Sequence, residues 1–287
     1  MMKGFRNLFA WCKKSFNLFN RYNGLKLSAS LSFYTVFSLA PFLIVVISVA
    51  GIFLGKNEVE GKVFVQLSGL IGKQGSDQIK DIIQYIQHSN HGIIGGIVGF
   101  VVLMFGASAV FSEIQESINF MWAVNNKKQQ GWLNILIRKL LSFSLLIGMG
   151  FILIVSLLVN AATDLLSDRL KMQFPEYSIY LFYGVNILII LFALTILFAV
   201  IFKVLPNAAI RWKDAITGAV FTALLFLAGK FLIGFYLGNS RIGLMYGTAA
   251  SVVVLMLWVY YSSIILYFGA AFTKIYSTKS GWLMQTK

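Results

Sequence analysis

The 287-residue sequence is short of the residues on which most catalytic and metal-binding sites depend. It contains one cysteine, two histidines and ten acidic residues, against 24 lysines and arginines. The single cysteine, Cys12, excludes an intramolecular disulfide and any metal site built from several thiolates. His88 and His91 share one polar stretch. They are either solvated loop histidines or half of a zinc site completed by Asp77 and Asp81, and the first interpretation needs no further ligand.

Charge of either sign is also scarce. Charged residues make up 12% of the chain, hydrophobic residues 58%, and the mean hydropathy is +0.79. Soluble domains carry about 25% charged residues, so we expect lipid around most of this surface. The sequence lacks an HExxH, a GxSxG and a glycine-rich phosphate loop. We therefore predict no enzyme activity, no catalytic residues, no cofactor and no metal.

The net charge of +14 raises the question of a nucleic-acid partner. The basic residues lie beside the apolar runs and form no continuous stripe or aromatic-interleaved patch, which argues against nucleic acid. Membrane lipids are the expected partners, and the sequence does not indicate an oligomeric state.

Long apolar runs dominate what is present. A span needs about 20 apolar residues to cross about 30 Å of hydrocarbon. Six runs meet this length, and they predict an all-α polytopic membrane protein with a single integral membrane domain. The predicted spans are Leu31–Leu54, Ile93–Phe111, Leu140–Ala161, Ile179–Val204, Ala215–Leu237 and Met245–Phe272.

The distribution of lysine and arginine predicts the orientation. With the N-terminus inside, sixteen cations fall on the cytoplasmic side and seven outside, and Lys230 is left within a span. This excess favours both termini in the cytoplasm. The 27 residues before the first span, with six cations, are too long for the n-region of a signal peptide.

Residues 1–27 are predicted to form a cytoplasmic amphipathic helix at the membrane interface. Anionic lipid would attract its cations, and docking of a partner protein is the alternative. Its apolar residues recur at helical spacing: Phe5, Leu8, Phe9, Cys12, Phe16 and Phe19.

The loop at residues 55–92 is the largest polar insertion and is predicted to face outward. Within it Ile79, Ile82, Ile83 and Ile86 repeat at helical spacing, after a plausible N-cap at Ser76. A short helix there either covers the outer mouth of the bundle or closes a gap between span ends.

Lys230 lies inside the fifth predicted span, where an ammonium group is costly to place. It either faces a cavity or snorkels toward the outer interface. Pro41 bends the first span, which serves a gate or only sets helix packing. Lys230 and Pro41 would belong to a substrate path with four tyrosines: Tyr34, Tyr236, Tyr246 and Tyr260.

A second polar group follows the predicted span at 93–111. Glu113, Glu116 and Asn119 share one helical face at the cytoplasmic end, with Trp122 one turn further on. This cytoplasmic polar cluster either binds a proton or cation, or neutralises lysines and arginines of a neighbouring loop. We expect Trp122 and Trp132 at the membrane interface.

Several short motifs resemble the YihY/BrkB family of bacterial membrane proteins. Each is weak alone, but their order and spacing cover nearly the whole chain. In the first half they are Ser32-Phe33-Tyr34 with Pro41, then Asn119 and Trp122. In the second half they are Pro206, Asp214-Ala215-Ile216, Gly218-Ala219, Ala228-Gly229-Lys230, Phe235-Tyr236, Tyr246-Gly247, Leu257-Trp258-Val259-Tyr260-Tyr261 and Gly269-Ala270.

The resemblance implies a six-helix protein of the bacterial inner membrane with cytoplasmic termini. Some members carry a virulence-factor label and some a ribonuclease label. Relatives often have Gly-Ala-Glu in the last span, where this chain has Gly269-Ala270-Ala271. A role for that glutamate, including pairing with a buried lysine, is therefore absent here.

Three hypotheses follow for function. The leading one is a transporter or exporter of a lipid-like or amphiphilic envelope substrate, in which Lys230 meets an anionic headgroup. The alternative is a structural or assembly protein of the envelope, with a dry, tightly packed bundle. A membrane-bound hydrolase or ribonuclease comes third, because it needs carboxylates or histidines that only the fold would bring together.

Overall fold

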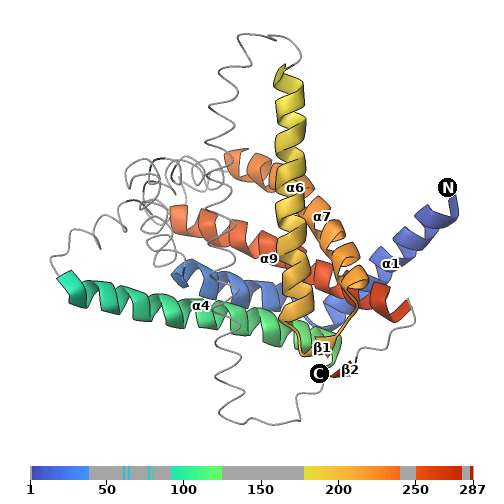
Figure 1. Cartoon of the computed structure of the whole chain (residues 1–287), viewed down its shortest axis with the longest axis horizontal. Helices are drawn as coiled ribbons and strands as arrows, with labels where there is room; N and C mark the ends of the chain where they lie inside the picture. The colour runs from blue at the N-terminus through green and yellow to red at the C-terminus, as the bar shows by residue number, and fades with distance from the viewer. Residues whose placement is uncertain are drawn as a thin grey trace.

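The computed structural model describes residues 2–38, 61, 64, 77, 80, 92–124, 178–239, 250–279 and 285–286. Within these ranges the chain is almost entirely helical, which confirms the predicted all-α class (Figure 1). The helices are α1 (Met2–Arg21), a second helical stretch at residues 24–38, α4 (Gly92–Trp122), α6 (Ser178–Val204), α7 (Trp212–Asn239) and α9 (Ala250–Lys279).

Three helices match predicted spans closely: α6, α7 and α9. Across the described part of the chain, two segments are long and apolar enough to cross a membrane, Trp212–Lys230 and Val252–Thr278, and a shorter apolar stretch covers Ile190–Val204. The predicted span at 140–161, most of the loop at 55–92 and the second half of the first span lie outside the described residues. The six-span count therefore stays a prediction.

Two helices continue beyond the ends that hydropathy predicted for their spans. α4 extends from the span at 93–111 to Trp122, as the helical spacing of Glu113, Glu116 and Asn119 predicted, and α9 extends past the predicted span end at Phe272 to Lys279. The apolar run marks only the part of a helix suited to hydrocarbon, whereas backbone hydrogen bonding continues into polar sequence. The residues of the predicted polar cluster therefore belong to α4 itself, which packs against other helices of the bundle.

α7 and α9 pack against each other through a reciprocal pair of glycines and threonines. An added Cβ on Gly218 would collide with Thr273, and one on Gly269 would collide with Thr222. Each threonine hydroxyl donates to the carbonyl of the glycine four residues before it in its own helix. Because the hydroxyls are satisfied within each helix, the two backbones approach closely without an unpaired polar group.

α6 packs antiparallel on the first half of α7. Three small residues of α7, Ala215, Ala219 and Ala223, are fully buried in the same cluster as Phe198 and Phe202 of α6. Phe198 of α6 lies against Phe226 of α7 with the ring centroids 6.1 Å apart. Aromatic residues of α6 and small residues of α7 thus share one buried cluster.

α1 and residues 24–38 run antiparallel along α9. The chain turns between them at Asn23, which has a left-handed φ of 52°, and Phe19 covers Gly24 so closely that a Cβ there would collide with its ring. Phe19 also contacts Phe268 at 6.2 Å between ring centroids, and the Ser32 hydroxyl donates to the Met256 carbonyl at 2.8 Å.

A short antiparallel pairing joins the two ends of the second half. β1 (Ala208–Ala209) follows α6, and β2 (Gln285–Thr286) lies at the end of the chain. Ala208 faces Thr286, and Ala209 faces Gln285. The loop between α6 and α7 and the C-terminal segment therefore meet where α4 and α6 end (Figure 1).

Candidate functional site

The loop after α6 is fastened by amide side chains of α4. Asn119 is buried, and its Oδ1 accepts a hydrogen bond from the backbone N–H of Asn207 at 2.8 Å. Gln115, one turn earlier, donates from Nε2 to the carbonyl of Leu205 at 2.7 Å and to Oδ1 of Asn207 at 3.3 Å. These bonds satisfy backbone groups that the end of a helix leaves open. Asn119, predicted as part of a polar cluster, therefore fixes a loop.

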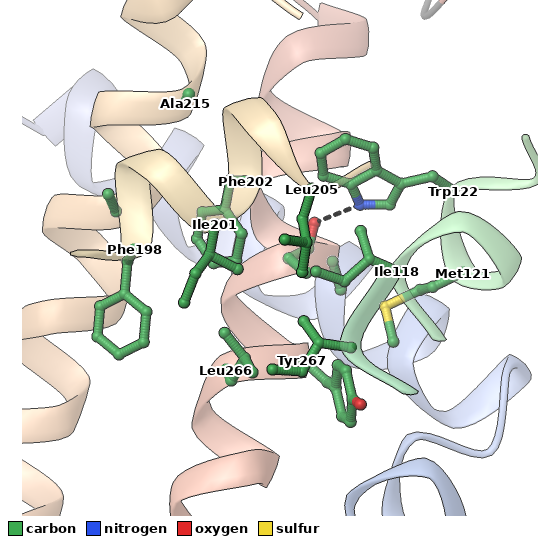
Figure 2. Close-up of a cluster of buried hydrophobic side chains, with 14 of the residues drawn as sticks. Ile118, Met121, Trp122, Phe198, Ile201, Phe202, Leu205, Ala215, Leu266 and Tyr267 are labelled. Atoms are coloured by element: carbon green, nitrogen blue, oxygen red, sulfur yellow. Dashed lines mark hydrogen bonds between the residues drawn. The ribbon is translucent and has the colours of Figure 1, made fainter. Parts of the chain in front are cut away.

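Trp122 joins the end of α4 to α9. Its Nε1 donates to the carbonyl of Ala270 at 2.9 Å, and the side chain is 3% exposed (Figure 2). The expectation of an interfacial tryptophan at position 122 is therefore wrong. A carbonyl inside a helix already accepts one hydrogen bond, but its second lone pair is available to the indole N–H. A sequence pattern does not reveal a partner of this kind.

Lys274 of α9 closes the same junction from the other side. Its Nζ donates to the carbonyl of Met121 at 2.9 Å and lies 5.7 Å from the ring centroid of Tyr22. The ammonium thus satisfies a carbonyl at the end of α4, where the helix dipole favours a cation. We call Gln115, Asn119, Trp122, Asn207 and Lys274 the anchor cluster.

Polar side chains also hold the start of α7. Asp214 is buried in its first turn, where a carboxylate is favoured by the helix dipole, and Ser277 of α9 donates to its Oδ2 at 3.2 Å. Lys203 donates to the carbonyl of Ile210, and its Nζ lies 5.7 Å from the ring centroid of Trp212. The turn between α6 and α7 is thus held at both ends.

The two glutamates of the predicted cluster have different surroundings. Glu116 is exposed, whereas Glu113 is half-buried and accepts a hydrogen bond from Ser117 Oγ at 3.3 Å. Neither forms an ion pair with another described residue. Glu113 also acts electrostatically on the hydroxyl of Tyr267, a residue of α9 that is fully buried. Only Glu113, therefore, faces the interior of the bundle.

The outward side of α7 carries an apolar ridge that we call the α7 ridge. It consists of exposed residues at every fourth position: Trp212, Ile216, Val220, Leu224, Ala228 and Leu232. Arg211 and Lys213 are exposed at its first end, and Lys230 is exposed near its last. At 1.5 Å per residue, Lys213 and Lys230 stand about 25 Å apart along the axis, close to the thickness of a hydrocarbon core.

The other residues of the predicted substrate path do not gather around Lys230 in the part of the chain that the structure describes. Tyr34 is exposed beside Phe33, and Tyr260 is half-buried on α9. The neighbour of Lys230, Gly229, lies under the hydroxyl of Tyr261 instead. Tyr236 belongs to α7 but its side chain lies outside the described residues, as do Pro41 and Tyr246.

The apolar stripe of α1 is divided between protein and surroundings. Phe19 is buried on α9, and Trp11 contacts Tyr276 with the ring centroids 5.3 Å apart. Phe9 and Phe16 are exposed, with Lys13 exposed between them. Of the predicted stripe, Phe19 therefore holds α1 against α9, together with Trp11, whereas Phe9 and Phe16 remain exposed.

Sequence reasoning missed most of the anchor cluster. Its members Gln115, Asn207 and Lys274 were not singled out, although Gln115 and Asn119 stand one turn apart at the end of an apolar helix, a pattern that could have indicated them. Tyr267, outside the cluster, was also missed. Among the described residues no group of three or more histidines, cysteines or carboxylates could hold a metal. His88 and His91 lie outside these residues.

Relatives with similar sequences are described only as membrane proteins. The chain is 26% identical to a UPF0761 membrane protein of Verminephrobacter eiseniae, over 86% of this chain and 57% of the relative. It is 27% identical to one of Delftia acidovorans, over 92% and 62%, and 28% identical to one of Azotobacter vinelandii, over 92% and 63%. The chain thus spans about three fifths of the length of these relatives.

No solved structure matches the chain. A family model described as virulence factor BrkB matches residues 15–283, which include the anchor cluster, the α7 ridge and the reciprocal glycines and threonines. Because this match extends over most of the sequence, the chain belongs to the BrkB family of membrane proteins.

Proposed function

We propose that this protein transports or exports an anionic amphiphile, such as an envelope lipid, and carries out no chemistry on it. The observation that carries the proposal is the α7 ridge with cations near both ends. An acyl chain would lie against exposed apolar side chains such as Leu224 and Leu232. The anionic headgroup would be met by Arg211 and Lys213 at one interface and by Lys230 near the other.

Lys230 supports this proposal through its position. It is exposed on the same helix as the ridge, and it forms no hydrogen bond or ion pair with another residue that the structure describes. An ammonium group near the far edge of a span can reach the headgroup layer by extending its side chain. Such a group is available to bind a phosphate or carboxylate.

Purified protein in vesicles tests the proposal directly. Fluorescent phosphatidylglycerol, placed in both leaflets, is bleached from outside by dithionite, so lipid movement appears as bleaching beyond the outer half. Loss of one charge-assisted contact, worth about 1.4 kcal/mol, predicts a roughly tenfold slower movement for Lys230→Met. Lys14→Met, which removes an exposed cation of α1, is the matched control. Equal rates for Lys230→Met and the parent would remove the central residue of the proposal.

A structural or assembly role in the envelope is the second candidate. The close packing of α7 on α9 through Gly218 and Gly269 favours it, because a scaffold needs a rigid helix pair rather than a moving one. In this case the parent protein would leave the bleached fraction at one half, as in protein-free vesicles.

The proposal places the chain in the bacterial inner membrane with six spans and both termini in the cytoplasm. Cys12, the only cysteine, is a native reporter of this orientation. A membrane-impermeant maleimide should label it in permeabilised cells and not in intact ones. Burial raises the pKa of the Cys12 thiol, so its thiolate fraction and labelling rate should rise as pH increases from 7 to 9. Labelling in intact cells would contradict a cytoplasmic N-terminus.

A further inference from the structure

The hydroxyl of Tyr267 is the starting point, because it is buried without a hydrogen bond of normal geometry. Tyr267 is fully enclosed at the contact between α9 and α4, near Ile118 and Met121 (Figure 2). Buried hydroxyls almost always have a partner, since leaving one unsatisfied costs about 1–3 kcal/mol. An orphaned hydroxyl at this depth therefore indicates a group that the protein binds there.

Two further oxygen-bearing side chains surround this hydroxyl. Ser117 of α4 lies close enough to this hydroxyl for a side-chain hydrogen bond, although not with normal geometry, and Glu113, one helical turn away, acts on it through its charge. Ser117 Oγ is joined to Glu113 Oε1 by a long hydrogen bond of 3.3 Å. A carboxylate, an aliphatic hydroxyl and a phenolic hydroxyl from two helices thus converge on one place.

Glu113 is the most solvent-accessible of the three side chains, so a ligand could enter the site beside it. Tyr267 is fully buried and Ser117 is 3% exposed, whereas Glu113 is only half-buried. Glu113 also lacks an ion pair with any described lysine or arginine. The carboxylate is therefore both the charged member of the group and the one that solvent reaches.

We propose that Glu113, Ser117 and Tyr267 form a binding site for a small monovalent cation, Na⁺ or K⁺. Hard cations bind oxygen ligands, and a single carboxylate with two neutral hydroxyls matches one positive charge. A divalent cation would require more carboxylates. Water entering beside Glu113 would complete the coordination, and the bound ion would tie α4 to α9 next to the anchor cluster.

The site does not depend on the proposed transport function, because ion binding is measured without any cargo. The test is thermal unfolding of the purified full chain in detergent, followed by tryptophan fluorescence. NaCl and KCl are titrated separately against N-methylglucamine chloride at constant ionic strength. A tenfold excess of a bound ion over its Kd raises the folded-to-unfolded ratio about elevenfold, which for a chain of this length corresponds to a rise in Tm of about 2–3 °C.

Matched variants separate this site from a general salt effect. Glu113→Gln should abolish the ion-dependent rise, whereas Glu116→Gln, which changes the exposed carboxylate of the same helix, should keep it. Tyr267→Phe should unfold at a higher temperature than the parent in N-methylglucamine, because the orphaned hydroxyl is gone, and should gain less from Na⁺ or K⁺.

Three outcomes would overturn the proposal. The first is equal Tm values in all three salts for the parent, which would mean that the place holds water alone. The second is a full ion-dependent rise in Glu113→Gln. Should that variant fail to fold, Ser117→Ala and Tyr267→Phe decide, and a rise of full size in both would contradict the site. A lost transport activity with an intact ion-dependent rise would remove the proposed function and leave the site standing.

Discussion

The two ends of α7 differ in whether their polar side chains are buried and hydrogen-bonded or exposed. At its start, buried Asp214 is bonded by Ser277, and the neighbouring anchor cluster satisfies backbone groups of α4, α9 and the loop between α6 and α7. Near its other end Lys230 is exposed, on a helix face of exposed aliphatic side chains. At the start of α7, side chains thus form hydrogen bonds that fix the position of neighbouring backbone segments. At the Lys230 end, a charged side chain is exposed to the surroundings.

This difference indicates a division of labour. The anchored end has small residues at the helix contacts and polar side chains turned inward, a combination that fixes one arrangement of the helices. The exposed end has one such small residue, Gly229 under Tyr261, but no comparable polar cluster among the described residues. Changes at its exposed positions should therefore affect what the protein contacts more than whether it folds. Substitutions at the anchored end should therefore change the free energy of unfolding more than substitutions at the exposed end. Four substitutions test this difference.

The largest effect is expected where α7 and α9 approach most closely. Gly218→Val places a branched side chain against Thr273 and forces the helices apart, which should lower the free energy of unfolding by about 3 kcal/mol or abolish folding. Unfolding in detergent with increasing denaturant measures this change. Gly61→Ala is the control, since nothing lies within 4 Å of an added Cβ there. A neutral Gly218→Val would refute tight packing at this end.

A smaller loss is expected from the anchor cluster. Asn119→Ala leaves the N–H of Asn207 without its acceptor and should cost about 1–3 kcal/mol. The same unfolding measurement applies, with Asn20→Ala, at an exposed position of α1, as the control. If both variants unfolded at the same denaturant concentration, the loop would not be held as described.

A gain is expected where α4 ends. Ala123 has a left-handed φ of 55°, and the N–H of Val124 donates to the carbonyl of Asn119 at 2.9 Å, as in a helix end that usually carries glycine. Ala123→Gly should raise the free energy of unfolding by about 1 kcal/mol, because glycine adopts this conformation without strain. A Tm below that of the parent would show that the left-handed turn is not formed.

The smallest effect on stability is expected at the exposed end. Lys230→Leu should change the free energy of unfolding by no more than about 0.5 kcal/mol, because the side chain has no described partner to lose. The same variant should slow lipid movement as Lys230→Met does. A loss of several kcal/mol would place Lys230 in the packed part of the molecule and remove the contrast between the two ends.

Much of the fold could be predicted because apolar runs report directly on the solvent that surrounds a helix. Ile179–Val204, Ala215–Leu237 and Met245–Phe272 correspond to α6, α7 and α9 for this reason. The continuation of α4 to Trp122 agrees with the helical face predicted for Glu113, Glu116 and Asn119, whereas α9 extends past the predicted span end at Phe272, since a helix persists after its sequence becomes polar. The polar cluster was located on the correct helix, yet Glu113 and Glu116, three residues apart, turned out to have different environments.

Composition and periodicity alone determined that this chain is helical, that its long helices are apolar and where most of them lie, because these properties depend on each helix and its solvent. The partners of individual side chains were decided only by the tertiary structure. Trp122 donates a hydrogen bond to the carbonyl of Ala270, and Asn119 accepts one from the N–H of Asn207. Tyr267 is buried beside Ser117 and Glu113. These residues are remote in sequence, and no local pattern records which helix surfaces are brought into contact.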